Sequence, residues 1–443
     1  MSNALTQYLE LYRAQRATIH GHSPAALNAL RHAALQSLEA TPLPRKGQED
    51  YEAFDLEAVL APDYGVNINR LEFAGHDVDH GCTVPNLSTR LYTIVGDTFH
   101  ASRPAHADDE VLVTSLAQAP EQLLAEHYGS VATLQRPIVA LNTLLAQDGL
   151  LVHAPAGKVT HRPIQVVNIF NAAAPVMAVR RTLIVAEPGS HVQVLVCDHT
   201  QHAEQDYLSV QVVEIIAMEG ATVEYYDMEE STPRTHRLSS LHVRQHEGSN
   251  VLVNGITLLN GTTRNEYHIS VDGPNASTTL LGMAIASGEQ HVDTLSHIAH
   301  NAPRCKSDEM FKYVLDDHAV GAFAGKILVR ENCPRVEAYQ GNRNLCASST
   351  ARMHTKPQLE IYTDDVKCSH GTTIGQLDEE ALFYMRSRGI GRELARTMLM
   401  QAFMSDIIDG VRLEVLRDRL RHLVEKRFAG DLATCAGCNL NKK

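Results

Sequence analysis

Gly189-Ser190-His191-Val192 begins a pattern that returns at Gly220-Ala221-Thr222-Val223 and at Gly248-Ser249-Asn250-Val251: a Gly-x-x-Val turn that leads into a strand-like run. The copies stand 31 and 28 residues apart, and Gly273-Pro274-Asn275-Ala276 is a looser fourth one. A turn-and-strand unit that recurs roughly every 20 to 50 residues is typical of a solenoid, and strands alone indicate a β-helix. A β-sandwich stays open as the alternative, because the copies are degenerate and the strand spacing suits both folds.

Strand-forming composition surrounds these copies. From Leu150 to about Thr373 the chain consists of short runs rich in Val, Ile, Thr and Tyr, separated by Gly, Asn, Pro and Ser. Such runs are typical of strands bounded by turns. We therefore expect a mainly β core at residues 149–376, and the repeat favours a parallel β-helix.

The residues before this core predict helices. Ser23 and Pro24 suit an N-cap and a first helical position. The apolar residues that follow recur at helical spacing, at Leu27, Leu30, Ala34 and Leu38. Thr41-Pro42-Leu43-Pro44 ends this helix, and residues 120–127 and 137–147 suit two shorter ones. Residues 1–148 should form an N-terminal region of helices and mixed structure.

Helical signals return after the β core. Asp378 suits an N-cap, Leu377 and Leu382 are placed as a hydrophobic staple, and Gly389 marks the end of this first helix. Two further amphipathic helices have apolar positions at Leu394, Met398, Leu399, Phe403 and Ile407, and at Leu413, Leu416, Leu420 and Leu423. Residues 377–430 should form a small bundle that either caps the end of the β core or docks a partner in an apolar groove. Residues 431–443 should be a flexible tail.

Size and charge narrow the class of protein. The 443 residues carry 39 Lys and Arg against 52 Asp and Glu, and the net charge of −13 argues against nucleic-acid and anionic-membrane partners. No apolar run is long enough for a transmembrane helix and the N-terminus lacks a signal-peptide core, so we expect a cytoplasmic protein. The eight cysteines are too sparse for a disulfide framework, and most of the 24 histidines should lie on the surface or in loops.

The strongest chemical signal is Lys367-Cys368-Ser369-His370-Gly371, near the end of the β core. Side chains two residues apart on a strand leave the same face, about 6 to 7 Å apart, so Cys368 and His370 should point into one volume. That separation suits two ligands of a metal or cluster better than a thiol–imidazole dyad. Thiolate with imidazole favours zinc, copper or iron–sulfur chemistry, and further ligands would have to come from elsewhere, such as another chain. A structural Cys beside a loop His is the alternative.

Other candidate motifs are weaker. His291, His297 and His300 with Asp293 lie within ten residues, but on a strand His300 would leave the opposite face, and a polar face of the β core explains the group better than a metal cluster. Cys435-Ala436-Gly437-Cys438 has the spacing of half a zinc site or a redox pair, but it stands alone in the tail.

The sequence lacks the motifs that indicate nucleotide binding or hydrolysis. The segment from Gly321 to Ile327 is one residue short of a phosphate-binding loop and lacks the hydroxyl that meets magnesium, so we reject it as a nucleotide site. Neither Gly-x-Ser-x-Gly nor His-Glu-x-x-His occurs, so a serine hydrolase or a zinc protease has no support.

The residues around Cys368 and His370 resemble a known family. The run from Leu359 to Glu380, which continues from Leu382 to Ile390, is similar to the SufB/SufD family of the SUF iron–sulfur cluster assembly system. Further similar stretches are Pro44-Arg45-Lys46 with Glu49-Asp50-Tyr51, Leu141-Asn142, Asp148-Gly149, Pro155-Ala156-Gly157 and Pro163-Ile164. The resemblance covers roughly residues 40–430.

The resemblance implies a right-handed parallel β-helix and a non-catalytic scaffold subunit. It implies pairing with a SufB-like paralogue through the β-helix and binding of a SufC-like ABC ATPase through the C-terminal helices, with the ATPase activity in that partner. A nascent iron–sulfur cluster or iron at the SufB interface would be held by His370 and Cys368. A flavin is compatible with the family, no nucleotide binds to this chain, and a homodimer is expected when the chain is alone. The expected SufC dock consists of Leu382, Phe383, Met385, Leu394, Met398 and Phe403.

Two positions favour the SufD side of the family. SufB-like chains carry Glu directly after the His of the Cys-x-His segment and a sulfur-accepting Cys shortly before that segment, where this chain has Gly371 and Ala351. The family usually has a Trp where this chain has Tyr51, which should still act as an aromatic plug. Two other classes stay open: a β-helix polysaccharide lyase, which would need clustered carboxylates for calcium, and a structural homo-oligomer in which Cys368 and His370 only pack.

Overall fold

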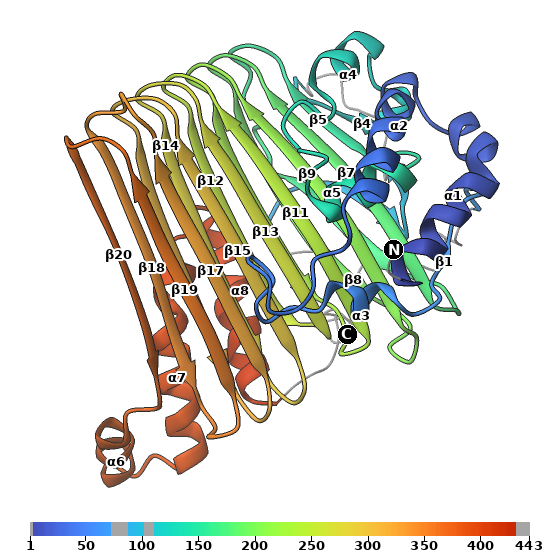
Figure 1. The fold of residues 1–443 in the computed structure, drawn as a ribbon. Helices are drawn as coiled ribbons and strands as arrows, with labels where there is room; N and C mark the ends of the chain where they lie inside the picture. The colour runs from blue at the N-terminus through green and yellow to red at the C-terminus, as the bar shows by residue number, and fades with distance from the viewer. Residues whose placement is uncertain (1–2, 72–86, 102–109, 431–443) are drawn as a thin grey trace.

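A parallel β-helix of two stacked sheets forms the centre of the computed structural model, which describes residues 3–71, 87–101 and 110–430 (Figure 1). Sheet A contains β19 (Arg352–Ile361), β17 (Val320–Val329), β15 (His291–His300), β13 (Thr262–Val271), β11 (Thr235–Gln245), β9 (Tyr207–Ala217), β7 (Val176–Ala186), β5 (Leu150–Ala154) and β4 (Leu112–Ser115), in this order, with β1 (Gly65–Val66) beside β7. Sheet B contains β20 (Val366–Gly375), β18 (Val336–Cys346), β16 (Lys306–Leu315), β14 (Ser277–Ala286), β12 (Asn250–Leu259), β10 (Thr222–Glu230), β8 (His191–Thr200), β6 (Ile164–Phe170), β2 (Arg90–Val95) and β3 (Thr98–Ala101).

Consecutive strands from β5 onward alternate between the two sheets, and neighbours within each sheet are parallel. Each coil therefore gives one strand to each sheet, so the predicted β-helix is confirmed and the β-sandwich alternative is wrong. Among the described strands, β3 and β4 alone pair in antiparallel fashion, with β2 and β5, at the end of the sheets opposite to β19 and β20. Because β2 and β4 precede residue 148, both sheets begin inside the region expected to be helical and mixed.

The repeated turn between the sheets is stacked in register. Gly189, Gly220 and Gly248 have positive φ angles of 69, 64 and 64°, and the amides of Gly189 and Gly220 each donate to a carbonyl of the next coil, at 2.8 Å. The same position in the following coils is held by Asn275, Arg304 and Arg335, with φ of 61, 60 and 60°. We call these six positions the turn column. The fourth copy of the motif is thus centred on Asn275, not on Gly273 as the sequence suggested.

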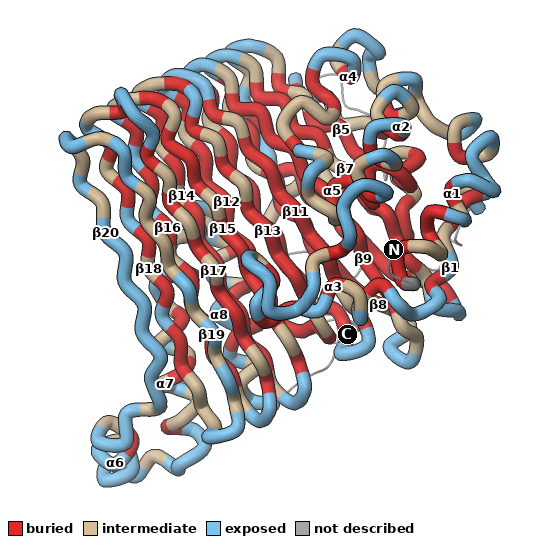
Figure 2. The backbone as a smooth tube through the Cα atoms, in the orientation of Figure 1, coloured by how far each residue is buried: buried red, intermediate tan, exposed pale blue. Residues whose placement is uncertain are grey.

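The space between the sheets is filled mainly by apolar side chains. The valines of the three Gly-x-x-Val turns, Val192, Val223 and Val251, all belong to this core. Alternate residues of each strand point into it, as the two-residue period of a strand requires. Figure 2 shows the resulting band of buried backbone through the middle of the molecule.

The N-terminal helices cover the outer face of sheet A: α1 (Asn3–Gly21), α2 (Ala25–Ala40), α3 (Leu56–Leu60), α4 (Glu121–His127) and α5 (Pro137–Leu145). Leu38 and Leu141 from these helices pack with Leu208 of β9. The Ser23 hydroxyl does not cap α2; it donates to the Ile19 carbonyl at 2.7 Å, and Pro24 occupies the cap position. A proline at the cap leaves no side-chain acceptor there.

Two C-terminal helices cover the outer face of sheet B, α7 (Arg392–Asp409) and α8 (Glu414–Phe428), whereas α6 (Glu379–Ser387) projects away from the sheets in Figure 1. Asp378 caps α6 by accepting from the amides of Glu380 and Ala381, as predicted, and Gly389 follows α6 with a φ of 87°. Lys312 of β16 fixes α7 by donating to the Phe403 carbonyl at 2.7 Å. The expected cap on the end of the β core is therefore wrong, because α7 and α8 lie along a face of the sheet.

The last coil is the least covered part of the β-helix. We call β19 and β20 the terminal coil; they are the outermost strands of sheets A and B. All eleven residues of β9 are buried, whereas the seven residues from Ser369 to Gly375 in β20 are all exposed. Figure 2 shows β20 as a pale ribbon at the edge of the molecule. No helix in the described ranges is long and apolar enough to cross a membrane.

Candidate functional site

Cys368 and His370 lie on β20 of the terminal coil. They pair in register with Ala338 and Gln340 of β18, both of which are buried and face the space between the sheets. The thiol and the imidazole therefore leave the same face of β20. This arrangement is the one that their spacing predicts.

Their surroundings differ. Cys368 is half-buried and packs against the edge of the inner core, and this burial raises the pKa of its thiol. Because a metal binds the thiolate, it would have to displace the thiol proton. The His370 imidazole is exposed and needs no such desolvation. His370 is thus the more accessible of the two candidate ligands.

The pair is incomplete as a metal centre. Within the described part of the chain, no group of three or more His, Cys, Asp or Glu side chains is arranged to hold a metal ion. Structural zinc sites take four protein ligands and iron–sulfur clusters are usually held by four cysteines, so two ligands make at most part of a site.

The two residues that favour the SufD side belong to the terminal coil or directly precede it. Ala351 precedes β19 and packs against the edge of the inner core. Gly371 follows His370, and a Cβ atom added there would meet no atom within 4 Å. Gly371 is therefore not required by packing, and a longer side chain would fit at this position.

The four residues that were weighed as a possible metal cluster are separated as the two-residue period predicts. His291, Asp293 and His297 lie on the outer face of sheet A, where Asp293 forms an ion pair with Arg264 and the His291 ring packs on Phe54. His300 is buried on the inner face and hydrogen-bonds the Ser307 hydroxyl at 2.9 Å. These contacts support a structural role for the four residues.

A column of three histidines was not predicted. His242, His268 and His297 occupy one register position on successive strands of sheet A, with ring centroids 4.8 and 6.4 Å apart. Burial lowers the pKa of each, that of His297 to about 4, so the three imidazoles are neutral at pH 7. We expected most histidines on the surface or in loops, and only the strand register reveals that these three align.

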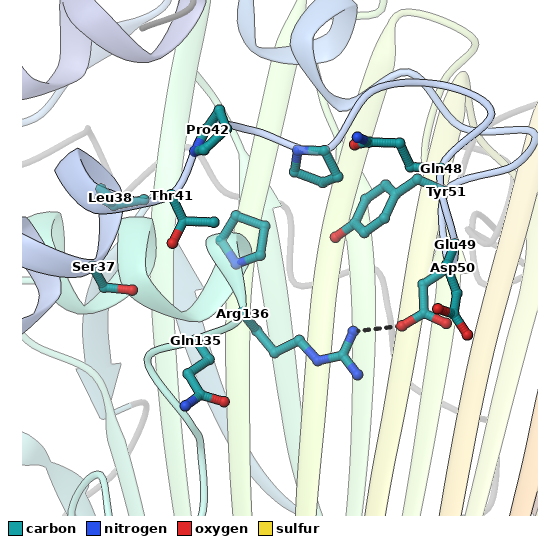
Figure 3. Close-up of a pocket in the computed structure, with 12 residues that line it drawn as sticks. Ser37, Leu38, Thr41, Pro42, Gln48, Glu49, Asp50, Tyr51, Gln135 and Arg136 are labelled. Carbon is teal, nitrogen blue, oxygen red and sulfur yellow. Dashed lines mark hydrogen bonds and ion pairs between the residues drawn. The ribbon is translucent and has the colours of Figure 1, made fainter.

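A cavity of about 730 Å³ lies between the C-terminal end of α2, the following loop and the start of α5 (Figure 3). Arg136 and Asp50 form an ion pair of 2.9 Å at its edge. Tyr51 lines it and is itself buried, with its hydroxyl donating to Glu266 at 2.9 Å and the Arg264 guanidinium 4.2 Å from its ring centre. The aromatic ring at position 51 thus joins this loop to the outer face of sheet A.

The six residues of the expected dock divide into three groups. Phe383, Leu394 and Met398 expose 73, 57 and 43% of their surface, and Tyr384, which was not predicted, exposes 59%. Met385 is half-buried. Leu382 is buried, and Phe403 packs on sheet B beneath Lys312. An apolar surface on α6 and the first half of α7 thus remains exposed, although two of the six residues do not contribute to it.

The two remaining motifs are the incomplete phosphate-binding loop and the cysteine pair of the tail. The segment from Gly321 to Ile327 lies within strand β17, so it forms no phosphate-binding loop. Cys435 and Cys438 lie outside the described residues.

These features define a class of protein: a parallel β-helix with helices on both outer faces, whose terminal coil presents a Cys-x-His pair at an open end. Residues 2–166 match the family model of the SufBD protein N-terminal region, and residues 168–403 match that of the SUF system FeS cluster assembly SufBD core domain. The chain belongs to the SufBD family of the SUF iron–sulfur cluster assembly system. This membership removes the support for a polysaccharide lyase.

Similar proteins agree with this family. A SufBD family protein of iron–sulfur cluster assembly from Synechocystis is 29% identical over 93% of this chain and 94% of its own length. The iron–sulfur cluster assembly protein SufD of Escherichia coli is 30% identical over 45% of this chain and 47% of its own length. SufD of Bacillus subtilis is 24% identical over 91% of this chain and 94% of its own length.

Proposed function

We propose that this chain is a SufD-type scaffold subunit of a complex with a SufB-like paralogue and a SufC-like ATPase, in which iron–sulfur clusters are built. The observation that carries this proposal is the open terminal coil with Cys368 and His370 on its inner face. The SufD names of two similar proteins, together with Gly371 and Ala351, support the SufD side of the family.

The terminal coil is the proposed contact with the paralogue. An outermost strand presents unpaired backbone groups to which another chain can add. Apolar side chains at this end are also exposed, among them Ile361, Tyr362 and Ile374. Covering them with a second β-helix would remove apolar surface from water and satisfy the strand edges. In the absence of the paralogue, a second copy of this chain could use the same surface and form a homodimer.

The interface would complete the metal site. His370 would bind iron or a nascent cluster through one ring nitrogen, Cys368 would act as a second ligand or support, and the paralogue would supply the remaining ligands. The iron and sulfide are cargo that the complex assembles and passes on. The chain itself acts as a scaffold, with ATP hydrolysis in the SufC-like partner, and a flavin would have to bind elsewhere than at the Cys-x-His pair.

The exposed apolar surface of α6 and α7 is the proposed dock for the SufC-like ATPase. Phe383, Tyr384, Leu394 and Met398 form it. Exposed aromatic and Met side chains of this kind are enriched in protein interfaces. Helix α6 projects away from the sheets in Figure 1, where a partner can reach it.

The test is co-expression with the SufB-like and SufC-like partners, followed by measurement of iron and sulfide in the purified complex. We expect His370→Ala to lower both several-fold while the complex stays intact. Ser369→Ala is the matched control, because Ser369 is exposed on the opposite face of the same strand. Unchanged iron and sulfide in His370→Ala would contradict the proposal and favour a purely structural role.

The dock has its own test. The double substitution Phe383→Ser and Leu394→Ser should release the SufC-like partner and retain the SufB-like one. Leu112→Ser, which changes an exposed apolar residue of β4, should retain both. Loss of both partners in the double variant would show that the helices are needed for folding, and retention of both would place the dock elsewhere.

A further inference from the structure

A polar column leads from the interior of the β-helix to His370. Glu309 of β16, Gln340 of β18 and His370 of β20 pair in register, so the three side chains stack on the inner face of sheet B. Glu309 is fully buried and Gln340 exposes 3% of its surface. Two buried polar side chains thus lie directly beneath the proposed iron ligand.

The Gln340 amide is only half-satisfied. Its Nε2 donates to Oε2 of Glu309 at 2.9 Å, which directs the nitrogen inward, toward the preceding coil. Its Oε1 is buried without a hydrogen-bond partner. A buried acceptor without a donor costs about 1 to 3 kcal/mol, so a donor is expected next to it.

The sheet A residues in register at this level do not supply that donor from a side chain. Gly325 of β17 lies against the amide, since a Cβ atom there would stand 2.5 Å from Gln340 Nε2. In the next coil Gly325 pairs with Pro357, which has no amide hydrogen. The Ser296 hydroxyl, in register with Gly325 one coil further in, lies next to Glu309.

The neighbours along β18 do not supply it either. Ala338 has no polar side chain, and Nδ2 of Asn342 donates to the Phe311 carbonyl at 3.4 Å and not to Gln340. On the outward side, the residue in register with Gln340 is His370. A neutral imidazole carries one N–H, and the other ring nitrogen is then free to bind a metal.

We propose that Gln340 is the positioning residue of His370: its Oε1 accepts the N–H of one ring nitrogen and so directs the other toward the open end of the β-helix. The inference rests on the proposed function of His370 as an iron ligand. Metal-binding histidines almost always donate their second N–H to an acceptor of this kind, which fixes the ring and makes it a stronger ligand. In this structure the ring is exposed, and the proposed bond requires rotation of the His370 side chain toward the acceptor.

Glu309 acts on His370 indirectly, through Gln340. It holds the Gln340 amide in the orientation that presents Oε1 outward. Burial raises the pKa of Glu309 to about 7, as expected for a carboxyl group far from solvent. A glutamine at this position would still offer an oxygen to Gln340 Nε2, so the arrangement depends on an acceptor at position 309 and not on its charge.

The test is anaerobic titration of Fe²⁺ into the complex with the SufB-like and SufC-like partners. Gln340→Met keeps the size of the side chain and removes both polar atoms, and we expect it to raise the Fe²⁺ dissociation constant about 10- to 100-fold. Glu309→Gln should remain close to wild type. Asn344→Leu is the matched control, because Asn344 is another buried amide of β18 that bonds a β20 carbonyl, at 2.9 Å from Thr373 O.

A second readout needs no iron. The ¹⁵N signals of the His370 ring are identified by their loss in His370→Ala. They should show one dominant tautomer in the wild type and in Glu309→Gln, and a mixture in Gln340→Met. Loosening of the fold alone would not select one tautomer.

The outcomes separate this inference from the proposed function. If His370→Ala abolishes Fe²⁺ binding and Gln340→Met binds as the wild type does, the positioning role is wrong and the iron site stands. Equal weakening by Gln340→Met and Asn344→Leu also overturns the positioning role, since it indicates general loosening. If His370→Ala itself binds Fe²⁺ normally, the proposed function fails first.

Discussion

The middle coils and the terminal coil of this β-helix are built from the same unit and differ in almost everything that surrounds it. In the middle, β9 is buried over its full length and helices cover both outer faces. At the end, no described helix or strand lies beyond β20, and its last seven residues are exposed. The backbone pairing is continuous from one to the other, so hydrogen bonding of the strands does not account for the difference.

Charged residues follow the same division. Arg181 and Glu214 form an ion pair with both side chains fully buried, whereas Lys367 of β20 is exposed and pairs with the half-buried Glu337 of β18. Buried pairs are costly to break and exposed pairs contribute little. The comparison indicates that substitutions in the covered coils should destabilise the fold more than substitutions in the terminal coil.

The largest effect should come from Glu214. Besides Arg181, its carboxylate accepts from the backbone amides of Gly129, Val131 and Ala132, at 2.9 to 3.1 Å. Glu214→Ala leaves a buried guanidinium without its partner and should lower the free energy of unfolding by about 3 to 5 kcal/mol. Urea unfolding followed by circular dichroism measures it. Glu219→Ala, at an exposed turn, should change the free energy of unfolding by about 0.5 kcal/mol or less. Equal losses in the two variants would contradict the comparison between covered and exposed regions.

A pH-dependent effect should come next, from His300 inside the β-helix. Burial lowers the pKa of His300 from 6.5 to about 4. Below pH 6.5 the unfolded chain takes up a proton on this residue while the folded chain does not, so stability is complete above pH 6.5 and is lost as the pH falls toward 4. At about 1.4 kcal/mol per pH unit, the loss reaches up to about 3 kcal/mol.

His300→Gln isolates this contribution. Glutamine can still bond Ser307 but does not titrate, so the variant should lose less stability than the wild type between pH 6.5 and 4. Unfolding midpoints at several pH values measure the difference, with pH 8 as the reference. Buried carboxyls such as Glu229, whose pKa is raised to about 7, act in the opposite direction in both proteins and cancel from the comparison. Parallel pH profiles would contradict the assignment.

A smaller pair of effects of opposite sign should appear in the turn column. Gly220→Ala meets no atom within 4 Å but forces a side chain into positive φ, which costs about 1 to 2 kcal/mol. Arg335→Gly, nearer the terminal coil, relieves the same strain and should gain up to about 1 kcal/mol, offset in part by the flexibility of glycine. Denaturant midpoints of the two variants test this, and a change of the same sign in both would mean that φ is not the cause.

The smallest effect should be that of Ile374→Ser in the terminal coil. Ile374 exposes 52% of its surface, so the substitution should change the free energy of unfolding of the isolated chain by about 0.5 kcal/mol or less. Val213→Ser, in the core of the middle coils, is the contrasting control and should cost several times more. A large loss in Ile374→Ser would show that this side chain is covered in solution.

The local parts of the fold were predictable, because short-range rules decide them. The Gly-x-x-Val copies predicted the repeating coil, and Asp378 and Gly389 predicted where α6 begins and ends. The two-residue period of a strand placed His300 on the opposite face from His291, Asp293 and His297. The failures concern contacts between distant segments. Whether α7 and α8 cover a face or an end of the β-helix depends on packing against Tyr226 and Leu252, more than 140 residues away in sequence.

The candidate site shows the same limit. Cys368 and His370 could be found from their spacing, whereas Gln340 and Glu309 lie 30 and 61 residues before His370 and carry no motif. Only the register of β16, β18 and β20 aligns the three. The same holds for the histidine column, whose members are 26 and 29 residues apart because the coils differ in length.

The repeated turn also means that the length of the β-helix is set by its number of coils. Each coil adds one strand spacing of about 4.8 Å, so ten strands per sheet set the far strand about 40 Å from the terminal coil. Because each turn bonds to the turns of the two neighbouring coils in the same pattern, a whole coil could be removed in frame and the remaining turns could still pair. Such a deletion would bring the N-terminal helices about 5 Å closer to His370, the proposed iron ligand. Loss or gain of whole coils can therefore change the distance between the N-terminal helices and the terminal coil in steps of one strand spacing, while the sequence of the terminal coil stays the same.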